Sequence, residues 1–328
     1  MNKFKELIFL IIIVLVFISC NKDHSQNLRK LRYLYVPGVQ DPFYQALERG
    51  IDEKAKELDV EVIFAPYPSV WSPEEQIKIM YESLLEVKSI DALLISPVAN
   101  DALIKPLKEI YQKGIEIITV DTYIGDGDYN QKSDYSFPLT YVGSDNEMGG
   151  KLMAEHLAFL IGGTGKIYCQ STNPDASSIY GRVKGFKEEL SKYPNIELVD
   201  ISWCLDDENV AQQQTLDALI KYPDIVGIFG VNVFSAQGSY KTVKNTGLSG
   251  AVKVASWDAT PTLIKALENG EVDLVLAQKP SEMGSMAVEL VTNYFKKKQV
   301  VPKRIYTGFV FFTRDNVFNP EIRKYIYE

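Results

Sequence analysis

The sequence predicts an α/β protein built from two doubly wound parallel-sheet domains. Short apolar segments alternate with amphipathic stretches along most of the chain, a pattern typical of strand–helix units in parallel sheets that are covered on both faces. The alternation restarts after an irregular stretch at residues 125–138. About ten expected strands therefore divide into two doubly wound domains more naturally than into one large sheet or an eight-unit barrel.

Helix start signals are clear in the first half of the chain. Asp41 and Pro42 fit the N-cap and first position of a helix over 43–58, whose apolar residues fall on one face. Ser72-Pro73-Glu74-Glu75 has the pattern of a capping box that opens a second helix. The expected helices are 43–58, 72–87 and 101–113, and the expected strands are 31–36, 60–65, 92–95 and 115–120.

The second half repeats the same alternation. The expected helices are 144–160, 179–190, 208–221, 236–245, 261–268 and 283–295, and the expected strands are 166–170, 197–203, 225–229, 252–257 and 274–277. Residues 318–328 form an amphipathic tail that we expect to pack on the second domain; the alternative is that it serves a partner.

The N-terminal segment has the pattern of an export signal. Lys3 and Lys5 precede an apolar run at 7–18, which is too short to cross a hydrocarbon core of ~30 Å comfortably. Residues 17–20 end in Cys20 and resemble the processing site of a bacterial lipoprotein. We therefore expect a signal peptide at 1–19, lipid on Cys20, a polar tether at 20–30, and an extracytoplasmic protein, periplasmic or at the cell surface. A plain secretory signal and an uncleaved anchor stay open as alternatives.

Composition excludes some function classes. The formal net charge is −8, which disfavours nucleic acid and anionic lipid as partners because phosphate binding needs positive charge. Cys169 and Cys204 lack the spacing of a metal site, and they are either two buried thiols or a disulfide. His24 and His156 are too few for a histidine-based metal centre or triad. We therefore expect no metal and no cofactor.

Side chains of two kinds follow the predicted strands. In open α/β sheets, ligands bind beyond the carboxyl ends of the strands. The residues at these ends are Asp41, Phe43, Tyr44, Trp71, Ser96 and Asp121 in the first half, and Trp203, Asp206, Asn232, Trp257, Asp258 and Gln278 in the second. Aromatic planes suit the C–H faces of a sugar ring, and carboxylates and amides suit its hydroxyls. The alternative is that the Asp and Asn residues are only helix caps and turn formers.

Several of these motifs, taken in order, resemble the ribose-binding-protein-like group of periplasmic sugar-binding proteins. They are Asp41-Pro42-Phe43-Tyr44, Val120-Asp121, 143–146, Trp257-Asp258-Ala259-Thr260-Pro261 and 276–278. The resemblance covers 31–315 and implies a periplasmic binding protein of type I. Its two lobes would be 31–142 plus 280–307 and 143–279 plus 308–328, with hinge crossings near 141–144, 278–280 and 306–309.

The same resemblance implies a function and a site. The protein would be the monomeric solute-binding partner of a membrane ABC permease and not an enzyme, and it would close on a monosaccharide. Phe43 and Tyr44 would sandwich the sugar, and Asp121, Asn232, Asp258 and Gln278 would bind its hydroxyls. A sensing lipoprotein for a chemoreceptor or sensor kinase is an alternative role, and a nucleoside is an alternative ligand.

This chain departs from the ribose binders at two arginine positions. Thr122 stands where they carry one arginine, and Tyr180 aligns with the second, although Arg182 lies two residues further on. Loss of these bidentate groups argues against ribose itself. Trp71, Trp203 and Trp257 favour a larger or less polar sugar, such as a hexose or a deoxy-sugar. Asp41 and Ser96 are further candidates for the site.

Overall fold

The structure is a computed structural model, and it describes residues 29–327. The expected signal peptide, Cys20 and most of the expected tether lie outside the described residues. Within the described part of the chain, no helix is both long enough and apolar enough to cross a membrane.

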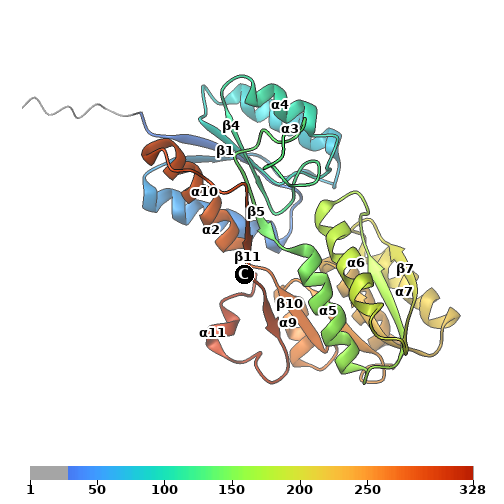
Figure 1. Cartoon of the computed structure of the whole chain (residues 1–328). Coiled ribbons are helices and arrows are strands. Elements are labelled where there is room, and N and C mark those ends of the chain that lie inside the picture. Colours follow the sequence, from blue (N-terminus) through green and yellow to red (C-terminus); the bar gives the residue numbers. More distant parts are fainter. Residues whose placement is uncertain (1–28, 328) are drawn as a thin grey trace, which may run out of the picture. The chain divides into compact units, whose positions relative to one another are not determined.

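The described fold contains two six-stranded sheets (Figure 1). The first has the order β11-β5-β4-β3-β1-β2, and the second has the order β12-β10-β9-β8-β6-β7. Neighbouring strands are parallel except for β12, which runs antiparallel to β10. The strands are β1 (Arg32–Val36), β2 (Glu61–Phe64), β3 (Ala92–Ile95), β4 (Glu116–Val120), β5 (Thr140–Ser144), β6 (Gly165–Ser171), β7 (Ile196–Trp203), β8 (Ile225–Gly230), β9 (Lys253–Trp257), β10 (Leu274–Ala277), β11 (Arg304–Thr307) and β12 (Val310–Phe312).

Helices cover both faces of each sheet, which confirms the predicted fold class. We call the first sheet with α2, α3, α4 and α10 lobe 1, and the second sheet with α5 to α9 and α11 lobe 2. In lobe 1, α2 packs on α10 while α3 and α4 pack from the other side; in lobe 2, α5 pairs with α6 and α7 pairs with α8. The helices are α2 (Pro42–Leu58), α3 (Pro73–Glu86), α4 (Ile104–Tyr111), α5 (Asn146–Leu160), α6 (Ser177–Leu190), α7 (Glu208–Lys221), α8 (Val233–Asn245), α9 (Pro261–Glu268), α10 (Pro280–Lys297) and α11 (Pro320–Arg323).

Both predicted N-caps form, but the capping box expected at 72–75 is incomplete, because the Glu75 carboxylate accepts the backbone N–H groups of Ser69 and Val70 and not that of Ser72. Asp41 caps α2 by accepting the Tyr44 N–H, and Ser72 caps α3 by accepting the Glu75 N–H, with proline at the first helical position in both. Each cap satisfies an N–H group that the helix itself leaves without a partner. Because the cap of α2 follows β1 directly, it also fixes where Phe43 and Tyr44 point.

The chain passes between the two sheets three times. It crosses from β5 to α5, from β10 to α10, and from β11 to β12. β11 therefore closes the edge of the first sheet, and β12 closes the edge of the second. A three-segment connection of this kind permits hinge motion, because only a few backbone positions have to change.

Three strands were missing from the sequence prediction. β11 pairs with β5, which is remote in the sequence. β5 pairs with the preceding strand β4, and β12 lies in the apolar run at 309–312, so a local signal for β12 was present but was not used. The helix expected at 101–113 is shorter: α4 begins at Ile104 because residues 101–103 form turns and no side chain caps its first turn.

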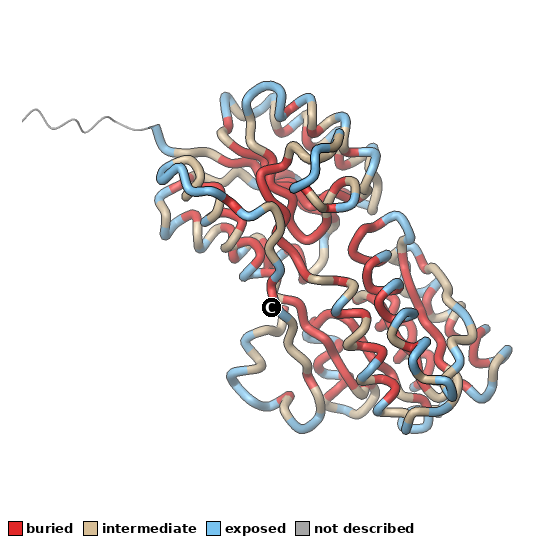
Figure 2. The backbone as a smooth tube through the Cα atoms, viewed as in Figure 1, coloured by how far each residue is buried: buried red, intermediate tan, exposed pale blue. Residues whose placement is uncertain are grey.

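The strand interiors are buried (Figure 2). All four residues of β3 and of β10 are buried, as expected for strands covered on both faces. One apolar core cluster contains Leu47 and Ile51 from α2 of lobe 1 together with Ile264 and Leu267 from α9 of lobe 2. The two lobes therefore share part of one core.

Close packing of α2 and α10 depends on glycine. Gly50 of α2 lies against the backbone carbonyl of Ser281, and Gly284 of α10 lies against the carbonyl of Leu47. A Cβ atom at either position would overlap the facing backbone. Both glycines therefore allow the two helices to approach more closely than alanine would.

We expect Gly50→Ala to destabilise the protein. Alanine favours a helix over glycine by up to about 1 kcal/mol, but overpacking a close helix contact costs about 1–3 kcal/mol. The net result should be a melting temperature lowered by a few degrees, measured by calorimetry. Gln45→Ala, on the exposed side of the same helix, is the matched control. A Gly50→Ala protein as stable as the control would contradict this account of the interface.

Candidate functional site

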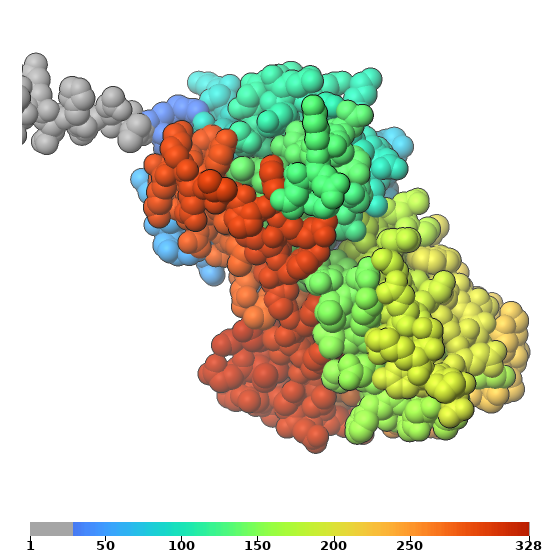
Figure 3. All heavy atoms as spheres, in the orientation of Figure 1, coloured from blue at the N-terminus to red at the C-terminus, as the bar shows by residue number. Residues whose placement is uncertain are grey.

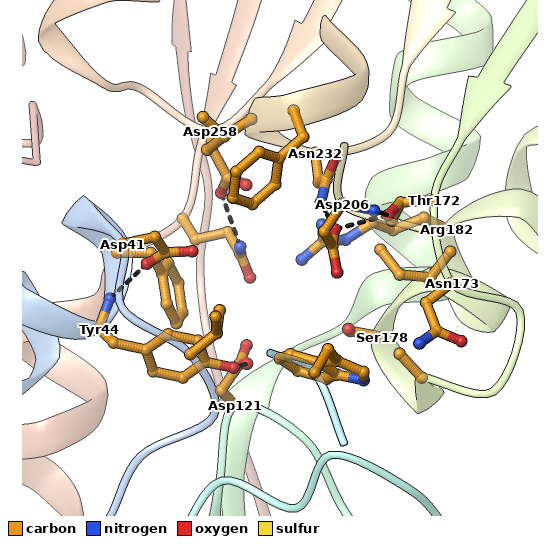
Figure 4. A pocket seen from close by; sticks show the side chains of 18 residues that line it. Asp41, Tyr44, Asp121, Thr172, Asn173, Ser178, Arg182, Asp206, Asn232 and Asp258 are labelled. Carbon is orange, nitrogen blue, oxygen red and sulfur yellow. Dashed lines mark hydrogen bonds between the residues drawn. The ribbon is translucent and has the colours of Figure 1, made fainter. Parts of the chain in front are cut away.

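A pocket lies between the carboxyl ends of the two sheets. Its cavity volume is about 50 Å³, and the total space among its side chains, open solvent included, is about 490 Å³. In Figure 4, Asp41, Tyr44 and Asp121 of lobe 1 face Arg182 and Asp258 of lobe 2 across it. The lining residues are Val39, Asp41, Phe43, Tyr44, Trp71 and Asp121 from lobe 1, and Thr172, Asn173, Ala176, Ser178, Ile179, Arg182, Asp206, Asn232, Val233, Phe234, Asp258 and Gln278 after the first crossing.

The start of α2 supplies one wall of the pocket. Asp41 Oδ1 accepts the Tyr44 N–H at 2.9 Å as the helix cap, and its Oδ2 has no partner among the described residues. The buried rings of Phe43 and Tyr44 meet edge to face, with centroids 5.2 Å apart. Trp71 lies beside them and packs against core clusters of both lobes. This wall is therefore aromatic, with one carboxylate at its edge.

Asp121 follows β4 at the floor of the pocket. Its backbone is left-handed (φ 67°), which is uncommon for a residue other than glycine. The Tyr44 hydroxyl donates to Asp121 Oδ2 at 2.9 Å, and the Tyr141 hydroxyl donates to the Asp121 backbone carbonyl at 2.8 Å. Burial raises the pKa of Asp121 to about 6, against the opposing effects of Arg182 and of the Tyr44 hydrogen bond.

Asp258 is the counterpart of Asp121 in lobe 2. It follows β9 and also has a left-handed backbone (φ 73°). Its Oδ1 accepts the Gln278 side-chain amide at 2.9 Å and the Tyr327 hydroxyl at 3.2 Å. Burial raises the pKa of Asp258, while Arg182 and these hydrogen bonds act in the opposite direction. Asp258 Oδ2 has no partner among the described residues.

Asp206 is a third carboxylate on the lobe 2 side. Its Oδ1 accepts hydrogen bonds from the Thr172 hydroxyl at 2.5 Å and the Asn232 amide at 2.7 Å (Figure 4). Asn232 Oδ1 at the same time caps α8 by accepting the Ser235 N–H at 3.0 Å. Asn232 therefore has both roles that its sequence position suggested, a cap and a pocket residue.

Arg182 is the single cationic side chain among the residues that line this pocket. It is buried over the Trp257 ring, with its guanidinium carbon 4.2 Å from the ring centroid. Its Nε donates to Asn146 Oδ1 at 3.0 Å, and its Nη1 donates to the Val231 carbonyl at 2.8 Å. Two hydrogen bonds and a stacked ring fix the group, and Nη2 donates to no described residue.

Four carboxylates thus line the pocket with one guanidinium, which donates its hydrogen bonds to Asn146 and Val231. Burial, together with the carboxylates of Asp258, Asp121 and Asp206, raises the pKa of Asp41 to about 8, against the opposing effect of the Tyr44 N–H. An uncompensated buried charge is costly, so a carboxyl group in this position binds a proton or another hydrogen-bond donor. In the described part of the chain, no group of Asp, Glu, His or Cys residues has the arrangement of a metal site.

Nine of the predicted site residues line this pocket. They are Asp41, Phe43, Tyr44, Trp71, Asp121, Arg182, Asn232, Asp258 and Gln278. The roles predicted for these residues towards a sugar stay predictions.

Four predicted residues lie outside the pocket. Ser96 is fully buried, and its hydroxyl forms a hydrogen bond with the Tyr35 hydroxyl at 3.2 Å. Trp257 is buried beneath Arg182. Tyr180 is exposed on α6, and Trp203 ends the edge strand β7, so both lie on the outer side of lobe 2. A strand-end position alone does not tell which way the side chain points.

The sequence analysis missed several residues that line the pocket. Thr172 and Asn173 directly follow β6, a strand whose end was not considered, and Ser178 lies in the first turn of α6. Asp206 was noted at a strand end but was not chosen. Considering the end of β6 like the other strand ends would have found Thr172 and Asn173. Cys169 and Cys204 are both buried and free.

Comparison with known proteins agrees with the geometry. A model of the periplasmic binding protein domain matches residues 33–299. The chain is 26% identical to the D-allose-binding periplasmic protein of Escherichia coli, over 80% of this chain and 84% of that protein. It is 24% identical to the ribose import binding protein RbsB of Escherichia coli, over 82% of this chain and 86% of that protein.

Solved structures show the same fold. An ABC transporter solute-binding protein of Agrobacterium vitis, bound to α-D-tagatopyranose, is 34% identical with a TM-score of 0.87, covering 91% of this chain and 100% of that one. A second Agrobacterium vitis solute-binding protein, with bound D-fucose, is 25% identical with a TM-score of 0.81, covering 90% and 99%. The chain belongs to the periplasmic binding protein family, in the ribose-binding-protein-like group of solute-binding proteins.

Proposed function

We propose that this protein captures a neutral monosaccharide between its two lobes and delivers it to an ABC importer. One observation carries the proposal: aromatic rings and hydrogen-bond acceptors from both lobes converge on one pocket. The similar proteins described above include solute-binding proteins bound to tagatose and fucose. Members of this group bind their solutes and are not enzymes, so we propose no catalytic step.

The aromatic wall suits one face of a pyranose or furanose ring. C–H groups of a sugar carry partial positive charge and pack well on aromatic planes. Phe43, Tyr44 and Trp71 supply such planes from lobe 1, and Phe234 supplies one from lobe 2. A sugar ring held between the lobes would therefore contact apolar surface on both of its faces.

Within residues 29–327, several acceptor oxygens around the pocket lack a partner, beside the unpartnered donors Trp71 Nε1 and Arg182 Nη2. Acceptor oxygens without a partner among the described residues are Asp41 Oδ2, Asp121 Oδ1, Asp206 Oδ2, Asp258 Oδ2 and the buried Gln278 Oε1. Each sugar hydroxyl donates one hydrogen bond, so a polyol satisfies several of these oxygens at once. A sugar acid or sugar phosphate would instead add negative charge to a site with a single guanidinium.

Binding would act through hinge closure. Asp121 reaches the pocket from lobe 1 and Asp258 reaches it from lobe 2, so one sugar bonded to both stabilises the arrangement in which the lobes are close. A ligand shifts a conformational equilibrium only by its differential contacts with the two states. The three crossings between the sheets would absorb the motion, and a membrane permease would recognise the closed form.

The protein works outside the cytoplasm, as its family implies. We further propose that lipid on Cys20 holds it at the membrane, and that it works as a monomer with one pocket per chain. This places the captured sugar close to the importer without requiring a second copy.

A thermal-shift screen tests the proposal. Neutral pentoses, hexoses and deoxy-sugars should include a ligand that raises the melting temperature, while sugar acids, sugar phosphates and nucleosides should not. A ligand at one hundred times its dissociation constant stabilises by about 2.7 kcal/mol, which is several degrees for a protein of this size. Stabilisation by a nucleoside or an anionic sugar, with none by a neutral sugar, would contradict the proposal.

Asp258→Asn should weaken binding of the sugar found in that screen by about 10- to 100-fold, since hydrogen bonds to charged groups contribute about 1.5–3 kcal/mol. Asparagine tolerates the left-handed backbone at this position, so the fold should persist. Isothermal titration gives the affinity, and Asp315→Asn, at an exposed position outside the pocket, is the control. Equal affinities of the two variants would remove Asp258 from the site.

A further inference from the structure

The segment that follows β12 returns to the pocket and places one tyrosine behind its wall, against Asp258 and Gln278. Tyr327 is 2% exposed. Its hydroxyl accepts the Gln278 backbone N–H at 2.7 Å and donates to Asp258 Oδ1 at 3.2 Å. Its backbone N–H donates to the Ala259 carbonyl at 2.9 Å. Tyr327 thus contacts Asp258 through the side chain and the next residue through the backbone.

The segment is anchored along its length. In the space-filling view it covers one edge of lobe 2 (Figure 3). Asn316 Nδ2 donates to the Phe311 carbonyl at 2.8 Å, Val317 is buried, and Arg323 pairs with Glu268 at 3.0 Å. These contacts hold residues 313–327 against lobe 2, so the position of Tyr327 is fixed independently of a ligand.

Tyr327 repeats in lobe 2 what Tyr44 does in lobe 1. In each lobe, the aspartate that follows a strand has a left-handed backbone. In each lobe a buried tyrosine hydroxyl also donates to one oxygen of that aspartate: Tyr44 to Asp121 at 2.9 Å, and Tyr327 to Asp258 at 3.2 Å. The backbone N–H groups of both aspartates also donate to the neighbouring strand, each at 2.8 Å. The two carboxylates are therefore held in the same way.

Phe43 lies against both tyrosines. Its ring meets Tyr44 edge to face with centroids 5.2 Å apart, and it meets Tyr327 edge to face at 5.8 Å. Tyr44 and Phe43 come from α2 of lobe 1, whereas Tyr327 comes from the segment on lobe 2. The row Tyr44–Phe43–Tyr327 is thus a continuous aromatic contact between the two aspartates.

We infer that Tyr327 is a positioning residue of the sugar site, which holds the Asp258 carboxylate so that its second oxygen faces the ligand. The inference rests on the proposed function. With Oδ1 occupied by Tyr327 and Gln278, only Oδ2 is available to a sugar hydroxyl. A carboxylate fixed before binding loses less conformational freedom when the ligand arrives.

Tyr327→Phe tests the inference, because it keeps the ring and removes the hydroxyl. The matched control is Tyr325→Phe, which removes another hydroxyl of the same segment, one that lies outside the pocket. The first readout needs no ligand: the Asp258 carboxyl carbon is titrated by NMR in the purified protein and assigned with Asp258→Asn. The Tyr327 hydrogen bond favours the charged carboxylate, so its loss should raise the pKa of Asp258, while Tyr325→Phe should leave that pKa unchanged.

The second readout is affinity, measured by isothermal titration with D-tagatose, D-fucose, D-allose, D-ribose and D-arabinose. The sugar that binds the wild-type protein should bind Tyr327→Phe about tenfold more weakly and Tyr325→Phe equally well. An unchanged Asp258 pKa overturns the inference, and so does a raised pKa with unchanged affinity. A wild-type protein that binds no sugar contradicts the proposed function, and the Asp258 titration still decides whether Tyr327 holds the carboxylate.

Discussion

The structure depends on one electrostatic constraint, the gathering of four aspartates around one pocket with a single guanidinium; Asp121 and Asp258 are buried, and Asp41 and Asp206 are partly exposed. Asp41, Asp121, Asp206 and Asp258 line one pocket with Arg182, and the pKa of each of these carboxyls is raised by burial. Charges held away from water need partners. The protein supplies some through tyrosine hydroxyls, amides and a helix N-terminus, and it leaves other oxygens for a ligand. A polar, uncharged, hydroxyl-rich molecule is what such a site can accept.

The fold makes this arrangement by placing two sheet edges face to face. Asp121 and Asp258 occupy equivalent positions after β4 and β9, each with a left-handed backbone that turns the side chain into the pocket. Backbone strain of this kind persists only where surrounding contacts determine it, and it clusters at functional sites. Here the contacts are strand hydrogen bonds and the hydroxyls of Tyr44 and Tyr327. The hydrogen-bonded sheets thus offset the free-energy cost of holding these carboxylates together.

Much of this could be predicted from sequence, because it is local. Neighbouring residues determine the helix caps at Asp41 and Ser72, and they also determine the alternation of strands and helices. The edge strand β11 was not predicted because its partner β5 is remote in the sequence. β5 and β12 were also missed, although β5 pairs with the preceding β4 and β12 lies in the apolar run at 309–312. Trp257 and Trp203 both lie at strand ends, where ligands are expected, but neither reaches the pocket. Trp257 lies beneath Arg182, and Trp203 ends the edge strand β7. Tyr327 carried no signal at all, because its role arises only where the segment after β12 folds back.

Proton release on binding tests the central claim most directly. Burial raises the pKa of Asp41 to about 8 and that of Asp121 to about 6, so with the lobes in this arrangement and no ligand bound, Asp41 holds a proton at neutral pH while Asp121 is mostly charged. Sugar hydroxyls donate to the charged carboxylates and therefore lower these pKa values. The measurement is isothermal titration at pH 7 in buffers of different ionisation enthalpy, with the sugar that binds. The account predicts a buffer-dependent heat that corresponds to net proton release. A heat independent of the buffer, or net proton uptake, would contradict it.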